Sequence, residues 1–320
     1  MRIFVCEYVT GGGFAGVPLP SGLLAEGEMM LRALLADLAA IPGVGFRTSR
    51  DARLPSVAIP GEIVAVGRRP CWAVWGEEIA AAEAVWPIAP ETGGILARLA
   101  DMAAGKILLG SSPEAVRLCA SKTATARHLA ARGIATVPSL APGIASPHGV
   151  IVKPDDGAGA EGVRFFADPA AATMARGAPG LIAQPFVPGA PESLSLLCRG
   201  GEVVLLACNR QVTECVEGRF HYRGLAVGGA EEKRALYTPL AAAIARAIPG
   251  LFGYVGVDLI ATGEGPVVLE INPRLTTSYA ALGGALGVNP AALVLALSGD
   301  GAMPCVAPPR AVSLPLAACD

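Results

Sequence analysis

One segment, residues 253–278, constrains the fold of this chain more than any other. It contains two β-branched, apolar runs, YVGVDLI and PVVLEIN, separated by the turn-forming residues TGEGP, a pattern that predicts a β-hairpin. Folding this hairpin about Glu264 places Asp258 opposite Glu270, and Asn272 follows on the same face two residues later. One face of the predicted sheet therefore gathers two carboxylates and an amide oxygen.

These three side chains predict a magnesium site. Carboxylates that lie opposite each other on a sheet repel each other, so a cation is expected between them. Mg²⁺ prefers oxygen ligands and shares its remaining positions with water and phosphate oxygens. Arg274, just beyond the second strand, could bind a phosphate or a carboxylate with its planar guanidinium. The alternative is an edge hairpin whose acids are simply solvated.

Lysine is scarce in this chain, and two of the lysines lie in contexts that suit phosphate binding. Only four of the 25 basic residues are lysine. Lys153 ends an apolar strand before a loop that contains Gly157 and Gly159, and the N–H groups of such a loop can approach phosphates. Lys122 opens a predicted helix after Ser121, a suitable N-cap. Taken singly, each lysine could equally be a solvated surface charge.

Taken in order, these motifs resemble the ATP-grasp superfamily of carboxylate–amine ligases. The matching segments are SKTATARHLAARGIATVP, VIVKPDDGAGAEGV, LIAQPFVPG, VGVDLI and VVLEINPR, which together span roughly residues 118–282. The EINPR end is the most specific part of the resemblance. The resemblance implies an α/β protein with the ATP-grasp fold: an N-terminal α/β, Rossmann-like domain followed by a two-lobed ATP-grasp domain with antiparallel sheets.

The resemblance also implies cofactors and the residues that bind them. ATP and Mg²⁺ are the implied cofactors, with Mn²⁺ as an alternative ion. Asp258, Glu270 and Asn272 would bind the metal. The segment PGAPES, which contains the position implied for the ribose, departs from the family pattern. The implied ATP-binding residues are Lys122 and Lys153 at the phosphates, Gly157 and Gly159 in the loop, Gln184, Phe186 and Val187 behind the adenine, and Glu192 at the ribose.

Two arginines and several smaller groups are expected around the reacting atoms. Arg274 would stabilise the phosphoryl group in transfer, and Arg210 could enter the cleft or form an ordinary ion pair. Weaker candidates for substrate binding lie near the first strand and beyond the hairpin, where the hydroxyls could equally cap a helix. These candidates are Gly12, Gly13, His221, Thr276, Thr277 and Ser278.

Further segments are similar to one branch of the superfamily, which joins the γ-carboxylate of glutamate to tyramine in methanofuran biosynthesis. These segments are EYVTGGGFAG, AEGEMMLRALLADL, NRQ and EINPRLTTSY. The resemblance implies glutamate as one substrate and tyramine, tyrosine or a longer glutamyl acceptor as the other, in methanofuran- or methylofuran-type one-carbon metabolism. Two alternatives stay open: a ligase for another pair, such as D-alanine with D-alanine, and a non-catalytic ATP-binding module.

A glycine pattern near the N-terminus suggests a different nucleotide site. The first strand is followed by GGGFAG, which contains the spacing GxGxxG found in dinucleotide-binding proteins. Such a site needs a helix that begins at the loop, with its N-terminus at the pyrophosphate. Two prolines follow instead and delay the predicted helix to about Ser21, which argues against a dinucleotide-binding domain.

Composition excludes several classes of partner. The net charge of −2 provides no basic field for nucleic acid. No uninterrupted apolar run approaches the roughly 20 residues that a membrane-spanning helix needs. The eight cysteines form no CxxC pair, which favours a reduced, cytoplasmic protein over a disulfide-rich or zinc-binding one. We therefore expect small-molecule substrates, and a homodimer stays open.

The expected organisation has four parts. Within the first part, residues 22–41 predict an amphipathic helix, and 62–66 and 71–75 predict strands. The parts are an N-terminal α/β domain over 1–113, an ATP-grasp lid lobe over 114–186, a C-terminal lobe with the metal site over 187–304, and an irregular, proline-rich tail over 305–320.

Overall fold

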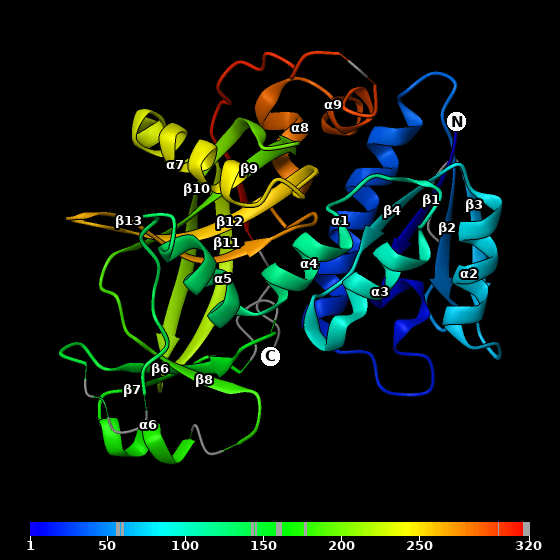
Figure 1. The fold of residues 1–320 in the computed structure, drawn as a ribbon. Helices are drawn as coiled ribbons and strands as arrows, with labels where there is room; N and C mark the ends of the chain where they lie inside the picture. Colours follow the sequence, from blue (N-terminus) through cyan, green and yellow to red (C-terminus); the bar gives the residue numbers. More distant parts are fainter. Residues whose placement is uncertain are drawn as a thin grey trace.

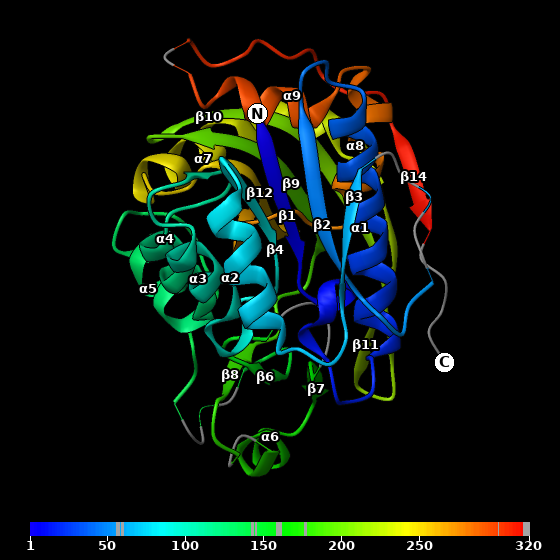
Figure 2. The same ribbon diagram turned by 90° about the vertical axis from the view of Figure 1, so that its right-hand side faces the viewer.

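Two β-sheets organise the molecule, each with helices packed against it (Figure 1 and Figure 2). The computed structural model describes residues 1–55, 58, 61–141, 144, 146–157, 162–175, 178–299 and 301–315. Among the described strands, all pairings of the first sheet are parallel and all pairings of the second are antiparallel. The expected α/β architecture, with an N-terminal α/β domain followed by antiparallel strands, is therefore confirmed.

The N-terminal sheet has five parallel strands in the order β3-β2-β1-β4-β5. Alternate residues of its central strand face two different cores, since successive side chains point to opposite faces. Ile3 and Val5 pack in the core that contains α1, whereas Phe4 and Cys6 pack in the core that contains α2. The elements are β1 (Arg2–Glu7), β2 (Gly45–Asp51), β3 (Glu62–Val66), β4 (Ala84–Ile88), β5 (Ile107–Leu108), α1 (Ser21–Ala39), α2 (Cys71–Ala81) and α3 (Ile95–Met102), with short turns η1 (Val9–Gly13) and η2 (Thr92–Gly94).

Helix α1 begins at Ser21, as the two prolines before it predict. Its buried residues recur at helical spacing along one face (Met30, Leu34 and Leu38 among them). The expected strand over 71–75 is wrong, because this segment forms the first turns of α2. A short apolar run does not distinguish a strand from a buried helix, and here Pro70 precedes the first helical residue.

The second sheet has nine strands, in the order β13-β12-β9-β10-β11-β7-β6-β8, with β14 paired to β11. Helices α4, α5 and α7 share one core with it, and α8 and α9 share another. The strands are β6 (Val150–Pro154), β7 (Arg164–Phe166), β8 (Leu181–Pro185), β9 (Ala190–Arg199), β10 (Glu202–Val216), β11 (Arg219–Val227), β12 (Gly253–Thr262), β13 (Gly265–Asn272) and β14 (Val312–Pro315). The helices are α4 (Pro113–Ala120), α5 (Lys122–Ala130), α6 (Pro169–Ala175), α7 (Arg234–Ala247), α8 (Tyr279–Leu286) and α9 (Pro290–Ala296), with the short turn η3 (Glu231–Lys233).

The C-terminal segment is not irregular throughout its described part, which corrects the expectation for 305–320. Val312–Pro315 forms β14 and pairs antiparallel with β11. Val312 and Leu314 pack against the core that contains α1 and α8. This alternation of apolar residues gives the strand a buried face despite the prolines around it. The expected domain boundaries after residues 113, 186 and 304 stay predictions.

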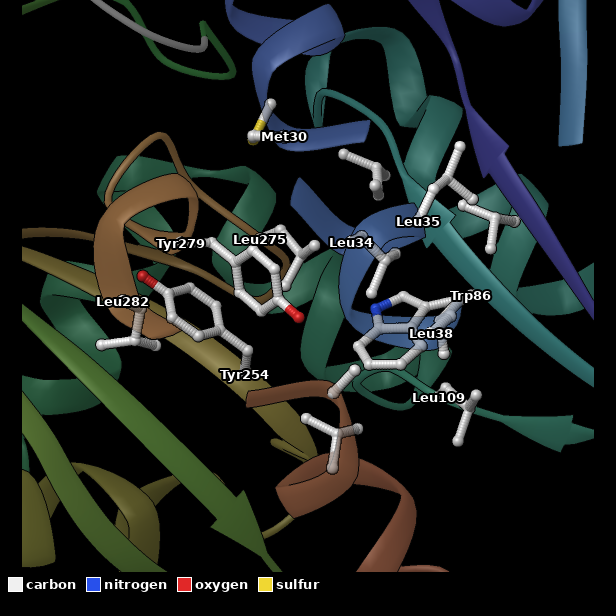
Figure 3. Packing of buried hydrophobic residues seen from close by; sticks show 14 of the residues in the cluster. Met30, Leu34, Leu35, Leu38, Trp86, Leu109, Tyr254, Leu275, Tyr279 and Leu282 are labelled. Atoms are coloured by element: carbon white, nitrogen blue, oxygen red, sulfur yellow. The ribbon is translucent and has the colours of Figure 1, made fainter. Parts of the chain in front are cut away.

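One apolar core joins the two sheets. It contains Leu34 and Leu38 of α1, Trp86 of β4, and Tyr254 and Tyr279 from the second half of the chain (Figure 3). The two tyrosine rings meet edge to face at 5.6 Å between centroids. This core fixes α1 against the antiparallel sheet.

Within the described ranges, no single helix has the length and apolar composition needed to cross a membrane. One helix pair, α8 with α9, meets that length and composition requirement only together, and the two helices are bent by 93° to each other.

Candidate active site

A single large cavity brings together residues from both halves of the chain. Its walls come from α1, the start of α5, strands β6 and β8 to β13, and the segment 274–278. Most of the polar residues singled out in the sequence reach it: Lys122, Lys153, Gln184, Asp258, Glu270, Asn272, Arg274, Thr276, Thr277 and Ser278. Phe186 and Val187 also line it.

The hairpin of β12 and β13 has the expected pairing, because Asp258 lies opposite Glu270. The register contains one feature that the sequence pattern did not predict. Near the turn, Thr262 pairs with Gly265 and Leu259 with Val268. A regular ladder would then place Asp258 opposite Leu269, but a β-bulge shifts the register there and brings Glu270 opposite Asp258.

The two acids of the hairpin have different environments. Asp258 accepts hydrogen bonds from the amides of Gln211 (2.7 Å) and Asn272 (2.9 Å). Burial and the charge of Glu270 raise the pKa of Asp258 to about 7. Burial alone would also raise the pKa of Glu270, but Lys122 and then Lys153 outweigh it and hold that pKa below its ordinary value. Glu270 is therefore favoured in its ionised form, whereas Asp258 is shifted toward its neutral form.

Both lysines are buried, at 6% exposure for Lys122 and 7% for Lys153. Lys122 Nζ lies 3.0 Å from a carboxylate oxygen of Glu270. Burial lowers the pKa of Lys153 to about 8, with Glu270 opposing this shift and Lys122 adding to it. A buried ammonium group facing a cavity is the opposite of a solvated surface charge, so the alternative reading of these lysines is wrong.

The start of α5 is fastened to the end of β6, which places the two lysines side by side. The carboxylate of Asp155 accepts hydrogen bonds from Ser121 Oγ (2.6 Å) and Thr123 N (2.8 Å). Ser121 Oγ in turn accepts from Ala124 N at 3.0 Å, so Ser121 is the N-cap that the sequence predicts. The backbone N–H of Lys122 donates to the carbonyl of Asp155.

The oxygen atoms of Asp258, Glu270 and Asn272 fit a divalent cation. Two partly buried carboxylates lie opposite each other, and the amide of Asn272, on the same strand as Glu270, lies beside them. A hard cation would relieve their repulsion. Across the described residues, no group of three or more His, Cys, Asp or Glu side chains is placed to hold a metal ion, so the set at the hairpin consists of two carboxylates and one amide oxygen. The donor set contains only oxygen, which suits Mg²⁺ better than a softer metal.

Another part of the cavity is lined by Gln184, Phe186 and Val187. The side chain of Gln184 donates to the carbonyl of Val137 at 2.8 Å. Strand β8, which contains Gln184, is therefore held both by its pairing with β6 and by the loop that precedes β6. Lys122 Nζ donates to the carbonyl of Gly157. Gly159 lies outside the described residues.

Arg274 is buried beside the hairpin and forms a two-point ion pair with Glu91. Its Nε and Nη2 atoms each donate to one carboxylate oxygen of Glu91 at 3.0 Å. Thr276 and Ser278 form a hydroxyl cluster with Tyr254, with oxygen–oxygen distances of 2.6 to 2.9 Å. The loop from β13 to α8 therefore presents a guanidinium and several hydroxyls to the same cavity.

Three predicted residues lie on strands but on the wrong face, because successive side chains of a strand alternate. Arg210 pairs with Glu232 at the surface, while its neighbour Gln211 enters the cavity. Glu192 is fully buried beneath α7, where it bonds to Lys233 and Tyr237, while Ser193 lines the cavity. His221 lies beside Tyr222, and it is Tyr222 that faces the cavity.

The glycines of the first loop also have a structural explanation. Gly12 and Gly13 belong to the π-helical turn η1, which follows β1, and are not among the residues that line the cavity. Gly12 has φ of 102°, and a Cβ at this position would lie 2.5 Å from Val66 Cγ1, so a side chain would clash there. The backbone conformation and the lack of space for a side chain therefore explain the glycine at position 12.

Sequence reasoning also missed the groups that reach the site from the N-terminal half of the chain. Glu26 and Met30 reach the cavity from α1, and Glu91 binds Arg274 from the loop after β4. Their spacing along the sequence carries no signal of contact with the hairpin, because the contacts are made only when the two sheets pack together. Met30 and Glu26 do share one helix face, since they are four residues apart.

Comparison with known protein families identifies the fold and its family. The sequence model of the ATP-grasp domain matches residues 119–278, and that of the pre-ATP-grasp 3 domain matches residues 44–116. The chain belongs to the ATP-grasp family. The ATP-grasp match contains the two cavity lysines, the acids of the hairpin and Arg274, whereas Glu26 and Met30 of the cavity wall lie outside both matched ranges.

Two curated relatives are tyramine–L-glutamate ligases. That of Methanocaldococcus jannaschii is 29% identical over 193 residues, which is 60% of this chain and 55% of the relative, so little more than half of that protein is matched. That of Methanocaldococcus fervens is 27% identical over 285 residues, covering 86% of this chain and 87% of the relative.

Solved structures share the fold. An ATP-grasp superfamily protein from Archaeoglobus fulgidus superposes with a TM-score of 0.72 at 24% identity, covering 99% of this chain and 100% of that one. The L-amino acid ligase from Bacillus licheniformis has a TM-score of 0.67 at 15% identity, covering 92% and 73%. At these identities the likeness extends to the fold alone.

Proposed function

We propose that this chain is an ATP- and Mg²⁺-dependent carboxylate–amine ligase that acts through an acyl phosphate. The observation that carries the proposal is the cavity in which Asp258, Glu270 and Asn272 face two buried lysines. A buried pair of ammonium groups beside an oxygen-only metal set suits a polyphosphate with its metal ion. Membership of the ATP-grasp family supports the class of reaction, and these residues support the binding of ATP and a metal ion.

The chemistry explains why such a site is needed. A carboxylate reacts poorly with an amine because oxide would have to leave, whereas an acyl phosphate releases phosphate. In-line phosphoryl transfer requires positive charge around the phosphate oxygens. Lys122 and Lys153 would hold the phosphates of ATP, and Arg274 would hold the phosphoryl group or the developing oxyanion. A divalent metal at Asp258, Glu270 and Asn272 would supply further Lewis-acid charge.

The adenine would lie against Gln184, Phe186 and Val187, where apolar side chains and the backbone after β8 form the wall of the cavity. Glu192 is not part of this proposal, because its carboxylate is used by Lys233 and Tyr237 beneath α7.

For the substrates we propose glutamate, activated at its γ-carboxylate, and an aromatic amine, either tyramine or tyrosine. The names of the two curated relatives support this pair, which would place the reaction in methanofuran- or methylofuran-type cofactor synthesis. A second candidate is a ligase for another amino-acid pair, favoured by the likeness to the L-amino acid ligase in fold.

Phosphate release from ATP and Mg²⁺ tests the proposal when glutamate is combined with tyramine or tyrosine in separate reactions. We expect phosphate only with glutamate and one of the amines, together with the mass of a glutamyl amide. Release with other amino-acid pairs but with neither aromatic amine would favour the second candidate. Absence of release with every pair in an amino-acid and amine panel would contradict the ligase proposal.

A further inference from the structure

Glu26 is an acid of the cavity wall that the proposed reaction does not yet use. It lies on α1 and lines the cavity, and across the described ranges it has no hydrogen bond or ion pair with another side chain. Glu28, two residues later, is different: it binds Arg32 and Arg50 at 2.7 and 2.9 Å. Glu28 is therefore occupied by structural ion pairs, whereas Glu26 faces the cavity.

The surroundings of Glu26 favour a cation that comes from outside the protein. Burial raises the pKa of Glu26, and the nearby Arg274 opposes this shift. Arg274 cannot also neutralise Glu26 fully, because its guanidinium is bound at two points by Glu91. A partly buried carboxylate without a bonded partner is costly, and a bound ammonium group would remove that cost.

Besides Arg274, apolar and aromatic groups lie near Glu26. Met30 lies four residues along α1 and so shares the same helix face. Tyr222 and Leu225 reach the cavity from β11, and both belong to or pack against the apolar core that contains Met30. The charge of Glu26 contributes to the raised pKa of Tyr222, after burial and the charge of Asp258, so the carboxylate lies close to that ring.

We propose that Glu26 binds the ammonium group of the amine acceptor, while Met30, Tyr222 and Leu225 pack against the hydrocarbon part of the same molecule. This assignment rests on the proposed ligase function and names the wall of the cavity that selects the acceptor. The acceptor class is a primary amine that carries an apolar or aromatic group.

The other ammonium group in the reaction is the α-amino group of glutamate. The apolar side chains around Glu26 favour the acceptor, because glutamate offers only two methylene groups for such a surface whereas an aromatic amine buries a whole ring. The experiment below separates the two.

Hydroxylamine makes the separation possible because it is small and mostly uncharged at neutral pH. It attacks the acyl phosphate, forms a C–N bond to the acyl carbon and expels phosphate, which leaves a γ-glutamyl hydroxamate. This reaction needs ATP and glutamate but no binding site for the ammonium group of an amine acceptor. We compare the wild type and Glu26→Gln in two assays: hydroxamate formation from glutamate, and amide formation from glutamate with tyramine or tyrosine as probe.

We expect Glu26→Gln to raise KM for the aromatic amine by about 10- to 100-fold, the range for loss of one charge-assisted hydrogen bond. Hydroxamate formation and KM for glutamate should stay at wild-type values. Glu77→Gln on α2 is the matched control, because Glu77 is exposed and pairs with Arg69, and it should behave as the wild type in both assays.

Two results would overturn the assignment. An unchanged KM for the amine would show that Glu26 does not bind it. An equal loss of hydroxamate formation, in a variant whose melting temperature matches the wild type, would assign Glu26 to glutamate instead. If the wild type forms amide and hydroxamate from another carboxylate but not from glutamate, this result would contradict the proposed substrate. The same comparison of KM for the amine between the wild type and Glu26→Gln, made with that carboxylate, would then test the assignment of Glu26.

Discussion

The two paired acids of the hairpin differ in how readily they ionise, although they lie opposite each other. Glu270 is stabilised in its charged form by Lys122 and Lys153, whereas burial and Glu270 hold Asp258 toward its neutral form. Before a cation binds, the site therefore carries less negative charge than two ionised acids would give. A metal ion, with the phosphates that accompany it, would complete the ionisation of Asp258.

Glu270→Gln removes an acid of the proposed metal site that also contacts Lys122. We expect ATP-dependent phosphate release with the substrates to fall by about 100-fold or more, because a proposed metal ligand and the counter-charge of two lysines are lost together. Glu264→Gln, at the exposed turn of the same hairpin, is the control and should keep wild-type activity. Wild-type turnover by Glu270→Gln would remove this acid from the site.

Asp258 should make stability depend on pH when metal is absent. Its pKa is higher in the folded protein (about 7) than its ordinary value of 3.8, so the folded state binds more protons than the unfolded chain between these values. Stability from the neutral acid is then present at low pH and is lost as pH rises through the folded pKa.

The comparison with Asp258→Asn isolates this effect, since the amide does not titrate. With a chelator present, the melting temperature of the wild type minus that of Asp258→Asn should decrease as pH rises from about 5 to about 7.5. A difference that stays constant over this range would contradict a raised pKa for Asp258.

At the residue scale, the sequence predicted side chains that belong to a motif and missed those that depend on strand alternation. Asp258, Glu270 and Asn272 were predictable because a hairpin fixes their relative face. Arg210, Glu192 and His221 were each chosen one position away from a residue that enters the cavity. A shift of one residue reverses the face of a strand, and neither the twist nor the exposed side of β9 to β11 is visible in the sequence.

At the level of elements, the junction between β6 and α5 is what presents both lysines to the cavity. Asp155 joins the two by accepting from Ser121 and Thr123. Burial alone would raise the pKa of Asp155, but these hydrogen bonds and Lys122 outweigh it and lower that pKa. The carboxylate therefore supports the junction at all but acidic pH, and its contribution is lost as pH falls through the folded pKa.

Asp155→Ala should lower the free energy of unfolding by about 1–2 kcal/mol, the usual effect of losing a helix cap and its hydrogen bonds. Because the start of α5 then loosens, we also expect weaker binding of ATP. Denaturant unfolding and equilibrium nucleotide binding measure the two effects.

Asp168→Ala provides the matched control for this prediction. Asp168 accepts from the N–H of Ala170 at the start of α6, so its loss also removes a capping contact, but no active-site lysine begins that helix. ATP affinity should stay unchanged in this control. An Asp155→Ala variant with wild-type ATP affinity would show that the junction does not position Lys122.

The predictions of helices and strands were correct where a local sequence pattern determines the element. They were wrong where tertiary packing determines it. Helix α1 and the hairpin of β12 and β13 follow their apolar spacing and turn residues. The segment 71–75 is helical because Trp75 and Val74 pack beneath the parallel sheet, and β14 exists because β11 offers a free edge to it. The bulge at Leu269 was not predictable, since an extra residue leaves no compositional trace.

At the scale of the whole molecule, the cavity is completed only when the two sheets pack together. The parallel sheet contributes Glu91 and α1, and the antiparallel sheet contributes the lysines and the hairpin. The contacts that join these parts include the ion pair of Glu91 with Arg274 at the cavity and, behind it, the hydrogen bond from Tyr279 to Asp37 at 2.8 Å.

The ion pair between Glu91 and Arg274 gives the last prediction. Both side chains are buried, at 7% and 11% exposure, and removing one partner leaves the other charge buried and unpaired. Glu91→Gln should therefore destabilise the protein by about 3–5 kcal/mol. The double variant Glu91→Leu with Arg274→Leu removes both charges and should recover part of that stability, as measured by denaturant unfolding. It should not recover activity, because Arg274 faces the cavity. Equal instability of the single and double variants would mean that packing, rather than charge, joins the two halves at this point.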